Sequence, residues 1–140
     1  MEKEYIKALS PDEKIIFLQI IFNLGCADKK VEQEEKGFIK KLLKDYELPS
    51  EKYPQVLQML NKQEIIERIN NISSIKKKYA LFIELFMMAN IDDDLDEREI
   101  DYILDLAESV NIPYEKMEEI NRYALDKIQC LRKYKEIMEN

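Results

Sequence analysis

The chain has 140 residues, which is enough for one compact domain with its own hydrophobic core. Its composition, 46% hydrophobic and 36% charged, excludes a disordered chain, and its formal net charge of −7 makes nucleic acid a poor partner because phosphate backbones are repelled. The absence of histidine excludes Ser-His and Cys-His catalysis as well as histidine-ligated zinc or haem, so we expect no enzyme.

Helix caps and apolar spacing predict helices along most of the chain. Ser10, Pro11 and Glu13 form a capping-box signature at the start of a helix that is apolar on most sides and ends near Gly25. The later apolar stripes and caps follow the same logic. The predicted helices cover about 10–25, 32–45, 53–60, 61–70, 74–90, 97–110, 114–120 and 121–138, with 74–90 the longest.

No alternation typical of strands persists in the sequence, so the predicted fold class is all-α with seven to eight helices in one domain, 1–140. The longest apolar stretch, Ile15 to Phe22, is too short to cross a bilayer, so we expect a cytoplasmic chain that is not membrane-embedded. Cys26 and Cys130 are expected to be buried free thiols.

A shift of 64 positions aligns the chain with itself without a gap, so that segment 10–57 falls on segment 74–121. Caps, acidic loops, helix-ending prolines and core positions all match in this register: Ser10 with Ser74, Asp28 with Asp92, Glu35 with Glu99, Ile39 with Ile103, and Pro49 with Pro113. The match predicts an internal duplication. Its two pseudo-symmetric helical units are expected to pack face to face as a single bundle domain.

Carboxylates gather in the loop before the second helix of each unit, most densely at Asp92, Asp94 and Asp96. Clustered carboxylates repel one another unless solvent or a cation relieves them, and without histidine or cysteine they suit Ca²⁺, Mg²⁺ or Mn²⁺. The loop is no EF-hand, because Glu97 stands where that loop requires glycine and Ile103 where it requires a bidentate glutamate.

The acidic loops also fit two roles that need no metal ion. Acidic residues at a helix start accept backbone N–H bonds and interact favourably with the helix dipole, which accounts well for Glu35, Asp96 and Glu99. A solvated acidic patch can also attract a basic protein surface. Lys76, Lys77 and Lys78 are interpreted as a solvated helix face.

Two runs share one pattern: Leu24-Gly25-Cys26-Ala27-Asp28 with Val31, Glu35 and Ile39, and Met88-Ala89-Asn90-Ile91-Asp92 with Leu95, Glu99 and Ile103. Both runs resemble the TerB-like motif of bacterial tellurite resistance proteins. That motif has small residues, Asp-Gly, an apolar residue, a glutamate in the following first turn and then an aliphatic stripe. Lys29 and Asp93 stand where the motif has glycine, which puts the geometry of both loops in question.

The resemblance implies an all-helical double bundle with an acidic surface that holds a divalent metal. Carried over by position, it points to Asp28, Glu35, Asp92 and Glu99 as ligands, beside Asp94 and Asp96 of the aspartate cluster. The expected function is a small cytoplasmic bacterial adaptor that binds a divalent cation or serves a stress response of the tellurite or metal resistance type. The alternative is a metal-free protein–protein interaction module. Either would have a protein partner and no organic cofactor.

Overall fold

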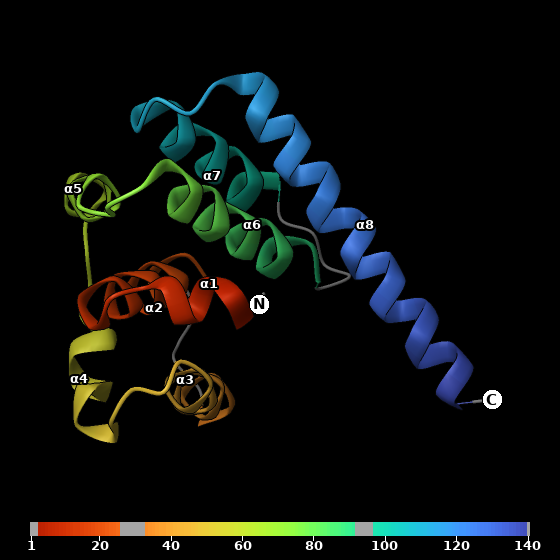
Figure 1. Ribbon diagram of the computed structural model, residues 1–140, viewed down its shortest axis with the longest axis horizontal. Coiled ribbons are helices and arrows are strands. Elements are labelled where there is room, and N and C mark those ends of the chain that lie inside the picture. Colours follow the sequence, from red (N-terminus) through yellow and green to blue (C-terminus); the bar gives the residue numbers. More distant parts are fainter. Residues whose placement is uncertain (1–2, 26–32, 92–96, 140) are drawn as a thin grey trace. The chain divides into compact units, whose positions relative to one another are not determined.

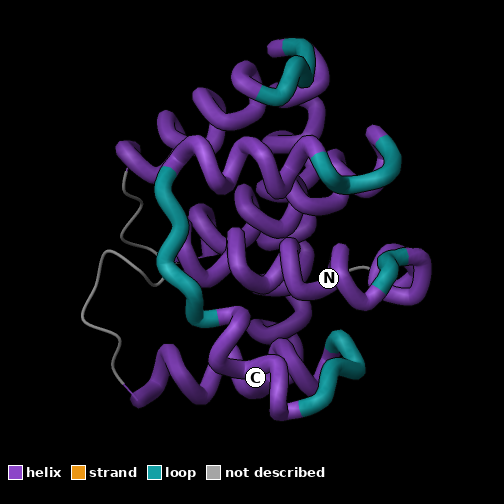
Figure 2. Tube along the Cα trace, turned by 90° about the vertical axis from the view of Figure 1, so that its left-hand side faces the viewer, coloured by secondary structure: helices purple, strands orange, loops and turns teal. Residues whose placement is uncertain are grey.

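The computed structural model describes residues 3–25, 33–91 and 97–139, with side chains described over 5–24, 39–90 and 97–139. Within these ranges every regular element is a helix, as Figures 1 and 2 show, so the all-α prediction is confirmed. The elements are α1 (Lys3–Ala8), α2 (Pro11–Gly25), α3 (Gln33–Asp45), the 3₁₀ turn η1 (Ser50–Lys52), α4 (Tyr53–Val56), α5 (Lys62–Asn70), α6 (Ile75–Ile91), α7 (Glu97–Ser109) and α8 (Tyr114–Glu139).

The chain divides into two compact units, Met1–Lys78 and Tyr79–Asn140. The first unit holds α1 to α5 and the start of α6, and the second holds the rest of α6 with α7 and α8. No helix in the described ranges is both long and apolar enough to cross a membrane.

Helix α2 is the centre of the first unit and contacts α3, α4 and α5. Because its sequence is apolar on most sides, it can be covered from several directions at once. Its buried apolar side chains, each at most 5% exposed, are Ile15, Phe17, Leu18, Ile20, Ile21 and Phe22. This burial confirms the predicted central helix. The six-residue α1, which has no cap signature and was not predicted, adds Ile6 to the buried core, and Leu9, directly after this helix, is also buried.

Two polar side chains of α2, Gln19 and Asn23, are also buried and are fully occupied. Gln19 Nε2 donates to the carbonyl oxygen of Gln55, and its Oε1 accepts from Arg68 Nε, both at 3.0 Å. Asn23 Oδ1 accepts the backbone N–H of Leu60 at 2.8 Å. These bonds satisfy buried polar groups and attach the segment after α4 to the central helix.

The second unit has one apolar stripe on each of α7 and α8, and these two helices contact each other. The stripe of α7 is Ile103, Leu106 and Ala107, and that of α8 is Met117, Ile120, Ala124 and Ile128. Helix α6 adds Leu81, Phe82, Leu85 and Phe86, all with no exposed surface.

Helix α8 runs unbroken for 26 residues, so the prediction of two stretches, 114–120 and 121–138, was wrong. The expected break was Asn121, a residue that often caps helices. Its side chain instead lies 3.5 Å from the Nδ2 of Asn90 on α6, and no proline or glycine follows to interrupt the backbone. The helix 74–90 is therefore not the longest. Cys130 is exposed on α8, contrary to the expected buried thiol, while Cys26 lies outside the described residues.

The 64-residue shift extends to helix bounds and turns. Helices α2 and α6 begin at matching positions, 11 and 75, while α3 and α7 match at both ends. The turns after α3 and α7 each place a non-glycine residue at positive φ, Glu47 at 58° and Asn111 at 65°. Equivalent backbone bonds close both turns, including Leu48 N to Leu43 O and Ile112 N to Ala107 O, each at 2.9 Å. The pseudo-symmetric packing of the two repeats, 10–57 and 74–121, stays a prediction.

Candidate functional site

Four of the six predicted metal ligands lie outside the described residues: Asp28, Asp92, Asp94 and Asp96. Glu35 lies in the first turn of α3, where the backbone alone is described, and Glu99 lies half-buried in the first turn of α7. Among the residues whose side chains are described, no three His, Cys, Asp or Glu residues group so that they could hold a metal ion. The cation site is therefore untested and stays a prediction.

The predicted capping box at the start of α2 is confirmed. Glu13 N–H donates to Ser10 Oγ at 3.1 Å, and Ser10 N–H donates to Glu13 Oε1 at 3.0 Å. A second capping box forms in the same way at the start of α5, between Asn61 and Glu64. In each box two backbone donors that a helix start leaves without partners are satisfied reciprocally.

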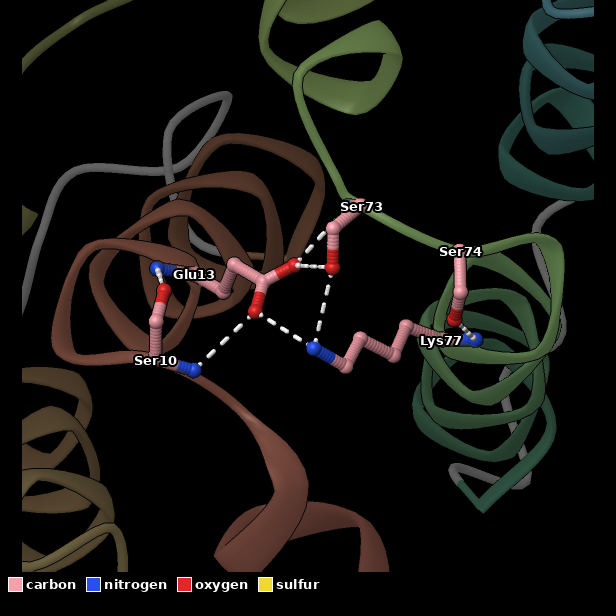
Figure 3. A network of polar contacts seen from close by, with 5 residues as sticks. All are labelled: Ser10, Glu13, Ser73, Ser74 and Lys77. Carbon is pink, nitrogen blue, oxygen red and sulfur yellow. Dashed lines mark hydrogen bonds and ion pairs between the residues drawn. The ribbon is translucent and has the colours of Figure 1, made fainter.

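Glu13 also binds the start of α6, as Figure 3 shows. Its Oε2 accepts the backbone N–H of Ser73 at 2.9 Å and the Ser73 hydroxyl at 3.0 Å. Its Oε1 accepts Lys77 Nζ at 2.8 Å, and the same ammonium donates to Ser73 Oγ at 3.0 Å. Glu13 is 5% exposed and its carboxylate accepts four hydrogen bonds, so it has little capacity left for a ligand.

These contacts set the charge state of Glu13. Burial alone would raise its pKa, but the bonds from Lys77, Ser10 and Ser73 favour the charged form and together lower the pKa from 4.5 to about 2. The interpretation of Lys77 as part of a solvated face was therefore wrong, since its side chain is only 20% exposed and pairs with this buried carboxylate. The cluster joins the N-termini of α2 and α6.

A groove of about 690 Å³ lies beside α7 and the start of α8. We call it the acidic groove; its lining residues are Asp101, Leu104, Asp105, Glu108, Asn111, Ile112, Pro113, Tyr114 and Met117. The three carboxylates follow one another at spacings of four and three, which puts them on one face of α7. No lysine or arginine is among these described lining residues.

The acidic groove has an apolar floor beneath its carboxylates. Ile112 and Met117 are 4% and 2% exposed and belong to the core of the unit. Tyr114, at the first turn of α8, is 68% exposed. A hydrogen bond to Glu118 and the charge of that residue raise the pKa of Tyr114. The groove can therefore take an apolar side chain whose neighbours are positively charged.

Exposed apolar side chains concentrate on α8. Of the nine large hydrophobic residues that are exposed in the described ranges, seven belong to this helix: Tyr114, Tyr123, Leu125, Leu131, Tyr134, Ile137 and Met138. Neither this surface nor the acidic groove was predicted, although both have a signal in the sequence. The carboxylates of α7 recur at helical spacing, and apolar residues continue into the charged end of α8.

No family model, curated protein or solved structure matches this chain. The resemblance to TerB-like proteins stays a prediction from the two motif-like runs.

Proposed function

We propose that this chain is a non-enzymatic protein-interaction module whose acidic groove binds a basic amphipathic helix of a partner protein. The observation that carries the proposal is the combination of three α7 carboxylates with an apolar floor in one groove. This proposal is the metal-free alternative expected from the sequence, and it names the lining residues of the acidic groove as the binding surface.

The chemistry of the groove supports a helical ligand. An amphipathic helix binds a groove through apolar anchors that recur every three or four residues, and the groove provides an apolar floor formed by Ile112, in the turn after α7, and Met117, on α8. Asp101 and Glu108 are seven positions apart, or about 10 Å along the helix axis, so they can pair with cations that lie about two turns apart on a helical ligand. Such charge pairs give specificity and speed of association more than affinity, which the buried apolar anchors supply.

Two synthetic peptides of roughly 15 residues test the proposal, one with leucine anchors among lysines and one with the same anchors among glutamates. We expect the basic peptide to bind with a Kd of about 1–100 µM by fluorescence anisotropy and the acidic peptide to bind at least about tenfold more weakly. Replacing Asp101→Lys together with Glu108→Lys should remove this preference, because the groove then repels cations.

The matched control is Asp45→Lys together with Glu67→Lys. Both positions are exposed in the first unit, and the pair changes the net charge by the same amount as the groove variant. We expect the control to weaken basic-peptide binding by less than about twofold in 0.15 M salt, because neither residue lines the groove and salt screens the change in net charge. Equal losses in both variants would mean that net charge, rather than the groove, attracts the peptide, and the proposal would then be wrong.

A second candidate function is the binding of a divalent cation by the acidic loops. The spacing of Asp92, Asp94 and Asp96 in the sequence favours it, since these carboxylates stand at alternate positions directly before α7. A cation there would stabilise the folded chain by mass action. The proposal is independent of the acidic groove and is tested separately below.

A further inference from the structure

We propose that the basic amphipathic helix bound by the acidic groove is the end of α8 from a second copy of this chain. The α8 tail is defined as residues 129–139, all of them exposed. The inference rests on the proposed function of the groove and names its partner. It follows from the charge, the apolar pattern and the length of α8.

The charges of the tail complement those of the groove. The tail contains three cations, Arg132, Lys133 and Lys135, and two carboxylates, Glu136 and Glu139, and its first seven residues hold all three cations and neither carboxylate. The groove presents three carboxylates and no cation among its described lining residues. Lys135 lies 4.0 Å from Glu139 one turn further along, but such an exposed pair contributes little and can exchange partners. A chain with a net charge of −7 thus places a short cationic segment on its last helix.

The tail also continues the apolar stripe of α8 beyond its last buried residue, and no described part of the chain covers this continuation. The buried positions of α8 end at Ala124 and Ile128, and Leu131 and Met138 continue the same helical spacing. Leu131 is 50% exposed and Met138 is 67% exposed, with Tyr134, at 64%, beside them. Exposed apolar residues arranged along one stripe are typical of a helix face that docks into another protein surface.

The tail of a copy cannot fill the groove of the same copy. Tyr114, which lines the groove, and Leu131 are separated by 17 residues of continuous helix, or about 26 Å at 1.5 Å per residue. Bringing the two together would break α8, whereas a neighbouring molecule can supply its tail without such a cost. Two copies can exchange tails reciprocally, which occupies both grooves and closes a twofold dimer.

A charge-exchange experiment tests this arrangement with the full chain. One variant reverses the tail, Lys133→Glu with Lys135→Glu, and the other reverses the groove, Asp101→Lys with Glu108→Lys. We expect the wild type to dimerise at low salt and each variant alone to be monomeric, because like charges then meet. An equimolar mixture should form a heterodimer, because acidic tail meets basic groove at one site and wild-type tail meets wild-type groove at the other.

Light scattering and sedimentation velocity give the readout, as a mass that rises from 16.8 kDa toward twice that value. Leu131→Asp should weaken the dimer at least about tenfold through loss of the apolar anchor, and Met59→Asp, which changes an equally exposed apolar residue in the first unit, should not. Circular dichroism and melting curves establish that every variant is folded.

Three outcomes would overturn the inference: a wild type that stays monomeric at about 200 µM and low salt, a groove variant that dimerises as well as the wild type, or a mixture that stays monomeric. The proposed function is separately accessible through the peptide titration on the monomeric Leu131→Asp variant. If that variant binds the basic peptide while no dimer forms, the groove function stands and the self-association proposal falls. If neither occurs, both fall.

Discussion

Lys77 Nζ lies 2.8 Å from Glu13 Oε1, and these two residues occupy matching positions of the 64-residue repeat. Each follows a serine cap by three positions, Ser10 in one case and Ser74 in the other. At one of the two positions the residue is an acid that completes a capping box, and at the other it is a base. The two equivalent helix starts therefore carry opposite charges, and the ion pair joins them.

The first prediction concerns the strength of this ion pair. Glu13→Gln keeps the shape of the side chain but removes the charge and turns an NH₂ group toward donors, so the partly buried Lys77 ammonium loses its charged partner and keeps only its bond to Ser73 Oγ. We expect the free energy of unfolding, measured with urea, to fall by about 2–3 kcal/mol. Glu64→Gln, in the exposed capping box of α5, is the matched control and should cost about 0.5–1 kcal/mol. If both variants lost the same free energy of unfolding, Glu13 would contribute no more than an ordinary capping residue, and the prediction would be wrong.

The second prediction is a dependence of stability on pH that comes from Glu13. Its pKa is about 2 in the folded chain against 4.5 for an ordinary glutamate, so the unfolded state takes up the proton first. The stabilisation is complete above about pH 4.5 and is lost as pH falls toward 2, by up to about 3 kcal/mol. Urea titrations at pH 7 and 2.5 should therefore differ less for Glu13→Gln than for the wild type. A parallel pH dependence in both proteins would contradict the assignment.

The third prediction concerns the turn after α3. Glu47 has φ of 58°, a left-handed conformation that strains any residue with a Cβ, and glycine relieves that strain. We expect Glu47→Gly to raise the free energy of unfolding by about 0.5–1 kcal/mol. Asn111→Gly, at the matching turn after α7, should gain less, because asparagine tolerates this conformation better. A destabilised Glu47→Gly would mean that the Glu47 side chain contributes more than its strain costs.

The fourth prediction tests the cation site. Asp92→Asn together with Asp94→Asn should abolish calorimetric binding of Ca²⁺, Mg²⁺ or Mn²⁺ while the helical circular dichroism spectrum stays nearly unchanged. Glu99→Ala should cost about 0.5–1 kcal/mol if its role is only to complement the start of α7. A loss confined to metal-containing buffer would identify Glu99 as a ligand. Absence of both heat and a melting shift in wild-type protein at millimolar metal would remove the cation proposal.

Much of the fold could be predicted because its determinants are local. The caps at Ser10 and Asn61 depend on residues three positions away, and the stripes of α2 and α7 follow from helical spacing alone. The predicted bounds of α2, α3, α5, α6 and α7 were correspondingly close, whereas the helix predicted over 53–60 ends at Val56. Lys77 shows where this reasoning stops, because the residue that binds it is 64 positions away and no local pattern indicates the contact.

The two wrong predictions on α8, a break before Asn121 and a buried Cys130, have a different physical origin. Asn121 has two roles open to it, cap or interior residue with a tertiary partner, and sequence alone does not decide between them. The contact with Asn90 on α6 decides for the interior role, and the helix then continues past Cys130 into a stretch with no buried side chain in the described chain. The acidic groove likewise depends on α8 lying beside α7, which periodicity cannot give.

The Asn23 side chain has a consequence for hydrogen exchange. Leu60 follows α4 in a stretch without regular structure, where amides ordinarily exchange with solvent through small local fluctuations. Its N–H donates to Asn23 Oδ1 on the most buried helix of the unit, so releasing it requires that α2 loosen. The slowest deuterium uptake should therefore include a loop amide, which would exchange together with the amides of the central helix.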